Sequence, residues 1–174
     1  MGETEPDSRH KRRDLAQTIE VLFEISDAVT HTRNPAELYR VIHRALNKIL
    51  NVDNFCIALL DEQRDAITFP YRVDEKDDIP EDILNFSKES TFTSRIIKKK
   101  SPLMFYEKDY FSMARETGKT PLGTAFKILL GAPLIIKNRV IGAMVIQDYQ
   151  SSSAYQDQDL VLLNSISRHV ALAI

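Results

Sequence analysis

The chain has 174 residues and a hydrophobic content of 43%, which is typical of one domain with its own core. Its 23 basic and 25 acidic residues leave a formal net charge of -2, and this balance excludes the strongly basic surface that recruits nucleic acid or an anionic membrane. A single cysteine, Cys56, excludes an intramolecular disulfide framework. The sequence has neither a secretory signal nor an apolar run approaching the ~20 residues of a membrane span, so we expect a cytoplasmic location without direct membrane contact.

Two helices are predicted near the start. The polar composition of 1–11 predicts a disordered tail, and a single folded domain is expected over 12–174, with its first helix beginning at about Arg12. Asn34 and Pro35 then predict the start of a second helix, which should end near residue 50. The apolar positions of the first helix recur every three or four residues, as in a coiled-coil seam: Leu15, Ile19, Leu22 and Val29, with Ser26 in the remaining position.

A β-hairpin is predicted next. Two apolar runs, 55–60 and 66–73, flank the charged segment 61–65, which has the composition of a turn. Pro70 lies inside the second run and cannot donate a backbone hydrogen bond. We therefore expect Pro70 at a sheet edge or at a bulge.

The middle of the chain is less regular. The acidic stretch 74–89 predicts an irregular segment, 91–99 a short helix and 103–105 a brief strand. The mixed pattern of 106–124 predicts a long, lid-like loop containing one helical turn that ends near Gly118.

A second hairpin and a final helix close the sequence. The apolar runs 127–136 and 140–149 are joined by the polar turn 137–139. The helix expected over 156–174 carries a second seam, which runs to the last residue without a C-cap, so we expect it to continue into an output module. The members of this seam are Leu160, Leu163, Val170 and Ile174, with Ser167 in the missing position.

The order helix, helix, hairpin, lid, hairpin, helix resembles a GAF domain over about residues 15–174. The likeness is carried by the runs 54–62, 69–75, 130–134, 140–142 with 147–149, and the closing segment 155–174. It is similar to the GAF sensors that precede histidine kinases, diguanylate cyclases and phosphatases. The resemblance implies an α+β fold, PAS-like, with a central antiparallel sheet flanked by helices and the terminal helices packed together on one face.

The same resemblance implies a function and a site. It implies a regulatory domain, not an enzyme, that binds a small molecule between the sheet and the lid and signals to an output domain. The two seams in addition predict a parallel homodimer through the first and last helices. Arg72 is expected to clamp a carboxylate or phosphate, and Asp109 to accept from a donor on the ligand. Aromatic walls would stack on a small polar or nucleotide-like ligand. The candidate residues are Cys56, Tyr71, Arg72, Asp109, Tyr110, Thr124 and Met144.

Alternatives remain open at these positions. Tyr71 and Met144 are also compatible with the core, and Arg72 with a partner carboxylate on a loop. In that case the domain is a structural dimerisation module whose pocket is filled by its own side chains. A cyclic-nucleotide site is a further alternative, although of the family's Asn-Lys, Phe, Asp, Glu pattern only an aromatic and an aspartate match, at Tyr155 and Asp159. Gln156 stands where relatives carry a capping Ser or Thr, so Asp157 is expected to cap the last helix.

Metal, haem and enzyme chemistry find little support in the sequence. Its four histidines are scattered without the pairwise spacing of metal ligands: His10, His31, His43 and His169. Free methionine sulfoxide reductases share the GAF fold but use several cysteines, whereas this chain has one. No pair of nucleophile and base can be named.

Overall fold

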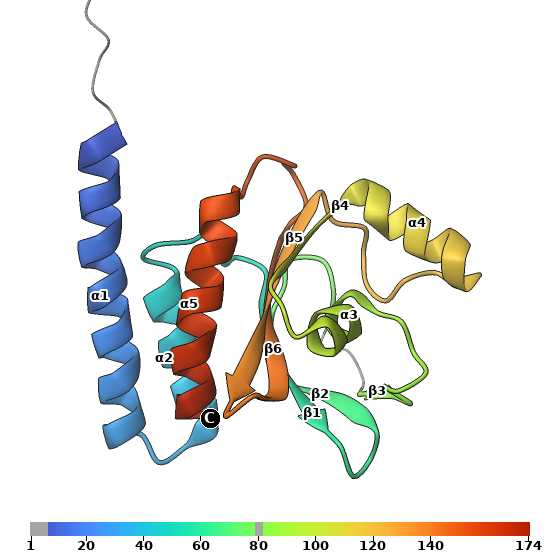
Figure 1. Ribbon diagram of the computed structural model, residues 1–174, viewed down its shortest axis with the longest axis horizontal. Coiled ribbons are helices and arrows are strands. Elements are labelled where there is room, and N and C mark those ends of the chain that lie inside the picture. The colour runs from blue at the N-terminus through green and yellow to red at the C-terminus, as the bar shows by residue number, and fades with distance from the viewer. Residues whose placement is uncertain (1–6, 79–81) are drawn as a thin grey trace, which may run out of the picture.

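The protein forms one six-stranded antiparallel sheet with helices on both faces (Figure 1). The computed structural model describes residues 7–78 and 82–174. The strands lie in the order β3-β2-β1-β6-β5-β4. Their bounds are β1 Phe55–Asp61, β2 Ala66–Val73, β3 Ile83–Leu84, β4 Leu103–Tyr106, β5 Ile128–Ile136 and β6 Arg139–Asp148. The helices are α1 Asp7–His31, α2 Pro35–Leu46, α3 Phe92–Lys99, α4 Glu107–Thr117 and α5 Asp157–Ala173.

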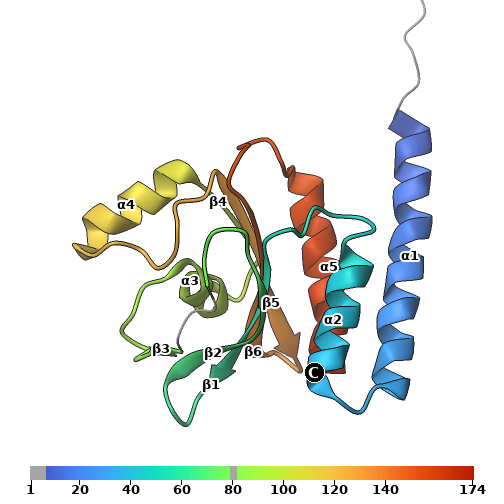
Figure 2. The same cartoon turned by 180° about the vertical axis from the view of Figure 1, so that it is seen from behind.

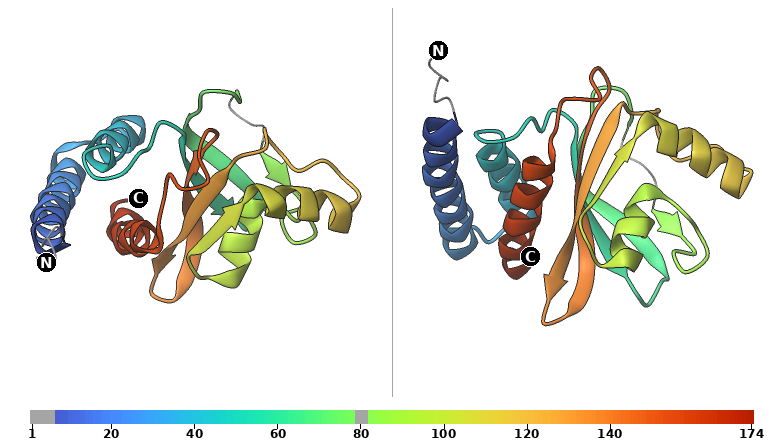
Figure 3. Two further views of the ribbon diagram at one scale, coloured as in Figure 1. Left: turned by 90° about the horizontal axis from the view of Figure 1, so that it is seen from above. Right: turned by 45° about the horizontal axis from the view of Figure 1, so that its top comes forward.

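The helices form two layers. α1, α2 and α5 lie on one face of the sheet, and α3 and α4 lie on the other (Figure 2). α5 packs directly on β5 and β6, while α1 is outermost and packs on α2 and α5 (Figure 3). The predicted α+β fold, with its antiparallel sheet and with the first and last helices on one face, is confirmed. Among the described residues, no helix has the length and apolar character needed to cross a membrane.

Two helix boundaries differ from the prediction. α1 begins at Asp7, so the part of the expected tail from residue 7 onward is helical, and residues 1–6 lie outside the described residues. α2 starts as predicted, because the Asn34 side chain accepts a hydrogen bond from the backbone N–H of Ala36 and Pro35 occupies the first turn. It ends at Leu46, after which the chain continues in turns.

The seam predicted on α5 is wrong. Leu163, Ser167 and Val170 are fully buried against the sheet, where the Ser167 hydroxyl donates to the Pro133 carbonyl at 3.1 Å. Helical periodicity identifies an apolar face but does not say what covers it, and here the sheet of the same chain does. At the start of this helix the side chain of Asp159, not that of Asp157, accepts the backbone N–H of Gln156.

The seam predicted on α1 lies at the surface. α1 buries a different stripe, formed by Val21, Ile25 and Ala28, in the core shared with α2 and α5. Leu15 is 64% exposed and Ile19 46% exposed. The outer face of α1 therefore remains apolar and uncovered within this chain.

The lid contains more structure than predicted. Residues 107–117 form α4, an eleven-residue helix that buries Tyr110 and Met113 and ends at Gly118 in the left-handed conformation, with φ 65°. The two-residue strand β3 was not predicted. It pairs with β2 at the sheet edge and buries Ile83.

Both hairpins are confirmed. Between β1 and β2 the register shifts from Ile57 opposite Tyr71 to Leu59 opposite Thr68, so a bulge contains Pro70, as predicted. The turn between β5 and β6 places Lys137 and Asn138 at positive φ, which matches the right-handed twist of the flanking strands.

Candidate ligand-binding site

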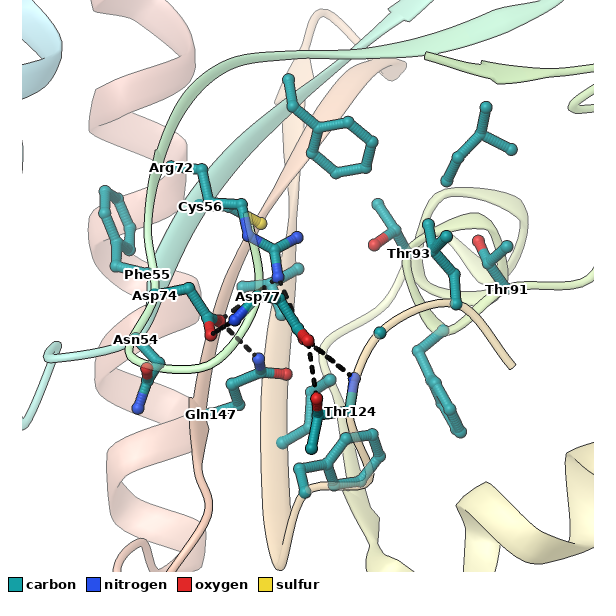
Figure 4. Close-up of a pocket in the computed structure, with 18 residues that line it drawn as sticks. Asn54, Phe55, Cys56, Arg72, Asp74, Asp77, Thr91, Thr93, Thr124 and Gln147 are labelled. Carbon is teal, nitrogen blue, oxygen red and sulfur yellow. Dashed lines mark hydrogen bonds and ion pairs between the residues drawn. The ribbon is translucent and has the colours of Figure 1, made fainter. Parts of the chain in front are cut away.

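A cavity of about 60 Å³ lies between the sheet and the layer that contains α3 (Figure 4). The charged members of its lining, Arg72, Asp74 and Asp77, lie together at one end, here called the polar end. The polar and sulfur-bearing members are Asn54, Cys56, Arg72, Asp74, Asp77, Thr91, Thr93, Thr124 and Gln147. The remaining members are Phe55, Phe69, Ile83, Phe92, Leu122, Gly123, Phe126, Leu129 and Val145.

Strand register builds the floor of the cavity. Cys56 on β1 is paired with Arg72 on β2 and with Val145 on β6, so these three side chains form one row across the sheet. Two residues further along each strand, side chains return to the same face. A second row therefore follows, with Asn54 beside Gln147, whose backbone N–H donates to the Asn54 carbonyl at 3.1 Å.

The roof is formed by the start of α3 and by the loop after α4. Thr91 caps α3, since its hydroxyl accepts the backbone N–H of Ser94. Tyr110 is buried beneath the loop and its hydroxyl donates to the Gly123 carbonyl at 2.8 Å. Tyr110 thus holds the roof loop without lining the cavity.

Asp77 ties the roof loop to the segment that follows β2. Its Oδ1 accepts the Thr124 hydroxyl at 2.6 Å, and its two oxygens lie 3.1 and 2.9 Å from the Thr124 backbone nitrogen. Burial raises the pKa of Asp77, but hydrogen bonds from Thr124 and Tyr149 and the nearby Arg72 charge outweigh burial, so the net pKa lies below its ordinary value. Asp77 is therefore a carboxylate at neutral pH.

The polar end of the cavity is a buried charged cluster. One guanidinium nitrogen of Arg72 lies 3.3 Å from Asp74 and 3.5 Å from Asp77. Asp74, with a side chain only 3% exposed, also accepts from the Gln147 amide and the Tyr149 hydroxyl, each at 2.8 Å. Within the described residues, every polar partner of Asp74 is a hydrogen-bond donor.

Two further groups at this end have shifted pKa values. Burial and the two carboxylates raise the pKa of Tyr149, so its hydroxyl stays protonated and acts as a donor. Burial also raises the pKa of the Cys56 thiol to about 12, against a smaller opposing effect of Arg72. Cys56 is thus a protonated thiol at neutral pH and a poor nucleophile.

The structure brings three of the seven predicted site residues together at the cavity. Cys56, Arg72 and Thr124 line it. Tyr71 and Met144 lie on the opposite face of the sheet, in the core beneath α2 and α5. Their predicted location is corrected because adjacent strand residues point to opposite faces, so Tyr71 cannot share a cavity with Arg72.

The other two predicted residues, Tyr110 and Asp109, belong to α4. Tyr110 supports the roof loop, as described above, and is not part of the lining. Asp109 accepts the backbone N–H of Tyr106 at 2.7 Å at the start of the helix. Its polar group therefore serves as a helix cap away from the cavity, which corrects its predicted place in the site.

Sequence reasoning missed the carboxylates and their partners. Asp74 and Asp77 belong to the acidic stretch that was predicted only as an irregular segment, and Tyr149 is 75 residues away from Asp74 in sequence. The run Arg72-Val73-Asp74 could have indicated this cluster, because a half-buried strand ends there directly before a carboxylate. An arginine and an aspartate two residues apart point to the same face of a strand.

An open groove of about 750 Å³ adjoins the cavity on the outside. Ile83, Thr91 and Leu122 line both spaces and therefore separate the groove from the cavity. The groove also contains Lys88 and Lys119.

Comparison with known proteins identifies the class. A family model of the GAF domain matches residues 32–174, and the chain therefore belongs to the GAF domain family. A search of curated proteins gives no match. Among the residues that the structure describes, no three His, Cys, Asp or Glu side chains are grouped so as to hold a metal ion.

Solved GAF structures resemble this chain closely in fold and distantly in sequence. The nlh2 GAF domain of A. aeolicus in an inactive state superimposes with a TM-score of 0.66 at 20% identity, covering 92% of this chain and 96% of that one. Residues 122 to 287 of a methyl-accepting chemotaxis protein superimpose with a TM-score of 0.68 at 16% identity, covering 86% of this chain and 93% of that one. Free methionine-R-sulfoxide reductase from Neisseria meningitidis, in complex with its substrate, superimposes with a TM-score of 0.67 at 13% identity, covering 90% of this chain and 87% of that one. At these identities the likeness shows the fold.

Proposed function

We propose that this GAF domain is a regulatory sensor that binds a small molecule in the cavity between the sheet and α3, and passes the binding event to an output module through its terminal helices. The observation that carries the proposal is Arg72 Nε, a buried donor without a hydrogen-bond partner among the described residues. A buried donor of this kind costs about 1–3 kcal/mol when it stays unpaired. A ligand that accepts from it recovers this free energy.

Binding is favoured over catalysis by the chemistry of the lining. One of the fold's neighbours is a reductase, but the single cysteine here has a pKa raised by burial. Thiol redox catalysis with a resolving partner needs a second cysteine and an accessible thiolate. We therefore assign the domain a sensory role, not an enzymatic one.

A physical path from the cavity to the helical layer supports signalling. Arg72 faces the cavity, and its neighbour Tyr71 faces α2, where the Tyr71 hydroxyl lies 2.9 Å from His43 Nδ1. His43 Nε2 lies 2.8 Å from the Val52 carbonyl, so this nitrogen is the donor and Nδ1 accepts from Tyr71. A displacement of β2 by a ligand at Arg72 would therefore act directly on α2 through Tyr71.

The exposed stripe on α1 supports a homodimer. Phe23 is 72% exposed and lies on the outer surface of α1 with Leu15 and Ile19. Large apolar side chains recurring along one helix face are suited to a helical partner. We propose that two copies pair through this face, with α5 contributing its exposed residues, Val161 and Leu172, in place of the buried seam.

The small volume of the cavity favours a second candidate function. About 60 Å³ accommodates only a few atoms, and Arg72 already has two carboxylate partners. A domain whose interior is completed by its own side chains would act as a dimerisation module alone. A nucleotide would require the roof loop to open.

Mass spectrometry of the purified protein separates the two functions. We expect the native spectrum of the wild type to show a bound small molecule, which denaturation releases for identification. Arg72→Ala should lose it, whereas Arg168→Ala, which removes an exposed arginine on α5, should retain it. A wild type that binds nothing, either as purified or after incubation with a metabolite extract, would favour the dimerisation module.

A further inference from the structure

The charges around the cavity do not favour an anionic ligand. One guanidinium, Arg72, faces two carboxylates, Asp74 and Asp77. Of the flanking residues, Lys76 lies over the Tyr149 ring at 4.8 Å, Glu75 accepts from the Asn54 amide at 2.9 Å, and Asp78 is exposed. The charged residues of the lining, Arg72, Asp74 and Asp77, therefore sum to a net charge of -1. An anion placed there would be the third negative charge beside one arginine.

The hydrogen-bonding capacity of Arg72 nevertheless requires an acceptor. Its carboxylate contacts are both made by one terminal nitrogen, while Nε is buried and unpartnered within the part of the chain that the structure describes. Arginine has donors only, so nothing but an acceptor can satisfy Nε. The acceptor must come without a negative charge, because the carboxylates already neutralise the guanidinium.

Two other lining groups have unused capacity. Gln147 donates through its amide nitrogen to Asp74 and Tyr149, and no hydrogen bond to its side-chain oxygen is found among the described residues. The Thr93 hydroxyl, within the same residues, also has none. Figure 4 shows Arg72, Gln147 and Thr93 around the same space. Arg72 offers a hydrogen-bond donor, the Gln147 side-chain oxygen an acceptor, and the Thr93 hydroxyl a group that can donate or accept.

The rest of the wall is apolar. Phe69, Phe92 and Phe126 contribute aromatic surface, and Leu129 and Val145 contribute aliphatic surface. Phe92 and Phe126 meet edge to face, with ring centroids 4.9 Å apart. A ligand that fits must have a small hydrocarbon body behind its polar head.

We propose that the cavity selects a neutral, small amphipathic molecule and discriminates against a carboxylate of the same shape. The carbonyl-type acceptor of this molecule pairs with Arg72, and its branched or cyclic hydrocarbon body packs on Phe92 and Phe126. The proposal rests on the proposed sensory function and defines the ligand class of that site. It reverses the expectation from sequence that Arg72 clamps an anion.

A pair of probes of equal shape tests the charge preference. Isobutyramide and isobutyrate differ in the head group, and the acid is ionised at pH 7. We expect isobutyramide to bind with a dissociation constant on the order of millimolar, as suits its size. Isobutyrate should bind at least about tenfold more weakly, a difference of ~1.4 kcal/mol. Two-dimensional amide NMR titrations should locate the shifts at Cys56, Arg72 and Thr93.

A matched pair of variants assigns the preference to the cluster. Asp77→Asn removes one negative charge but keeps an oxygen that can accept from Thr124. It should reduce the ratio of the dissociation constants of isobutyrate and isobutyramide by about tenfold. Asp78→Asn removes the same charge from an exposed neighbour outside the lining and should leave this ratio unchanged. If Asp77→Asn fails to fold, the comparison of the two probes on the wild type still decides the proposal.

The outcomes separate this proposal from the sensory function. If isobutyrate binds the cavity as tightly as isobutyramide or more tightly, the neutral class is overturned while small-molecule binding stands. If neither probe shifts the cavity resonances, the proposed class is also overturned. The sensory function is decided independently by the mass spectrometry, and an anionic co-purified molecule bound through Arg72 would confirm sensing while refuting a neutral ligand.

Discussion

The contact between Thr124 and Asp77 should control the opening of the cavity roof, and Thr124→Val tests this. Valine keeps the branched shape at Cβ, so the backbone preference changes little and the backbone N–H still reaches Asp77. The lost hydroxyl bond to a carboxylate is 2.6 Å long, a type that contributes about 1.5–3 kcal/mol when shielded from water. Thr124 is exposed, so water competes for this contact and we expect a loss of only about 1 kcal/mol.

Hydrogen exchange and thermal unfolding measure this loss directly. In Thr124→Val, amides of residues 122–126 should exchange about fivefold faster, and the midpoint of unfolding should fall by roughly 2–4 °C. Thr120→Val is the matched control, since Thr120 lies on the same exposed loop and its hydroxyl has no hydrogen bond within the described chain. Equal exchange in the two variants would show that the hydroxyl does not hold the roof.

Three further predictions concern stability and assembly. Gly131→Ala should destabilise the protein by about 1–3 kcal/mol in urea unfolding, because the added Cβ would clash with the fully buried Ile96 side chain. A variant as stable as the wild type would contradict this tight contact. The pKa of Asp77 is lowered in the folded state, so this carboxylate stabilises the fold fully above its ordinary pKa of 3.8, and the stabilisation is lost as pH falls below that value. In acid titration, Asp77→Asn should therefore lose free energy of unfolding less steeply with falling pH than the wild type does, and identical slopes would count against this prediction. Leu15→Asp with Ile19→Asp should turn the dimer seen in sedimentation into a folded monomer, whose unfolding midpoint no longer depends on protein concentration. A wild type that is monomeric at tens of micromolar, an order set by typical dimer affinities, would remove the proposed interface.

Local signals predicted most of the fold. The apolar runs and the polar turns between them predicted both hairpins, and Asn34 with Pro35 predicted the start of α2. These features depend on residues near one another in sequence, for which the physical rules are short-ranged. α4 was predicted only as a single turn, since its buried face consists of just Tyr110 and Met113.

The candidate site was predictable only in part. Cys56 and Arg72 could be located because both lie on strands whose register follows from the hairpin and from the resemblance to the family. Tyr71 could have been excluded from the same cavity by strand alternation alone. Asp109 was chosen for its carboxylate, but a carboxylate at the third position of a helix satisfies a backbone N–H at that helix's own start.

The sequence by itself determined most of the elements, the fold family and which side chains share a face of each predicted element. Only the tertiary structure decided what each face meets. The apolar stripe of α5 proved to be core because the sheet covers it, whereas that of α1 remained exposed. Likewise Asp74 meets Tyr149 only because β1 and β6 pair, so a contact across 75 residues depends on sheet order, which short-range rules do not encode.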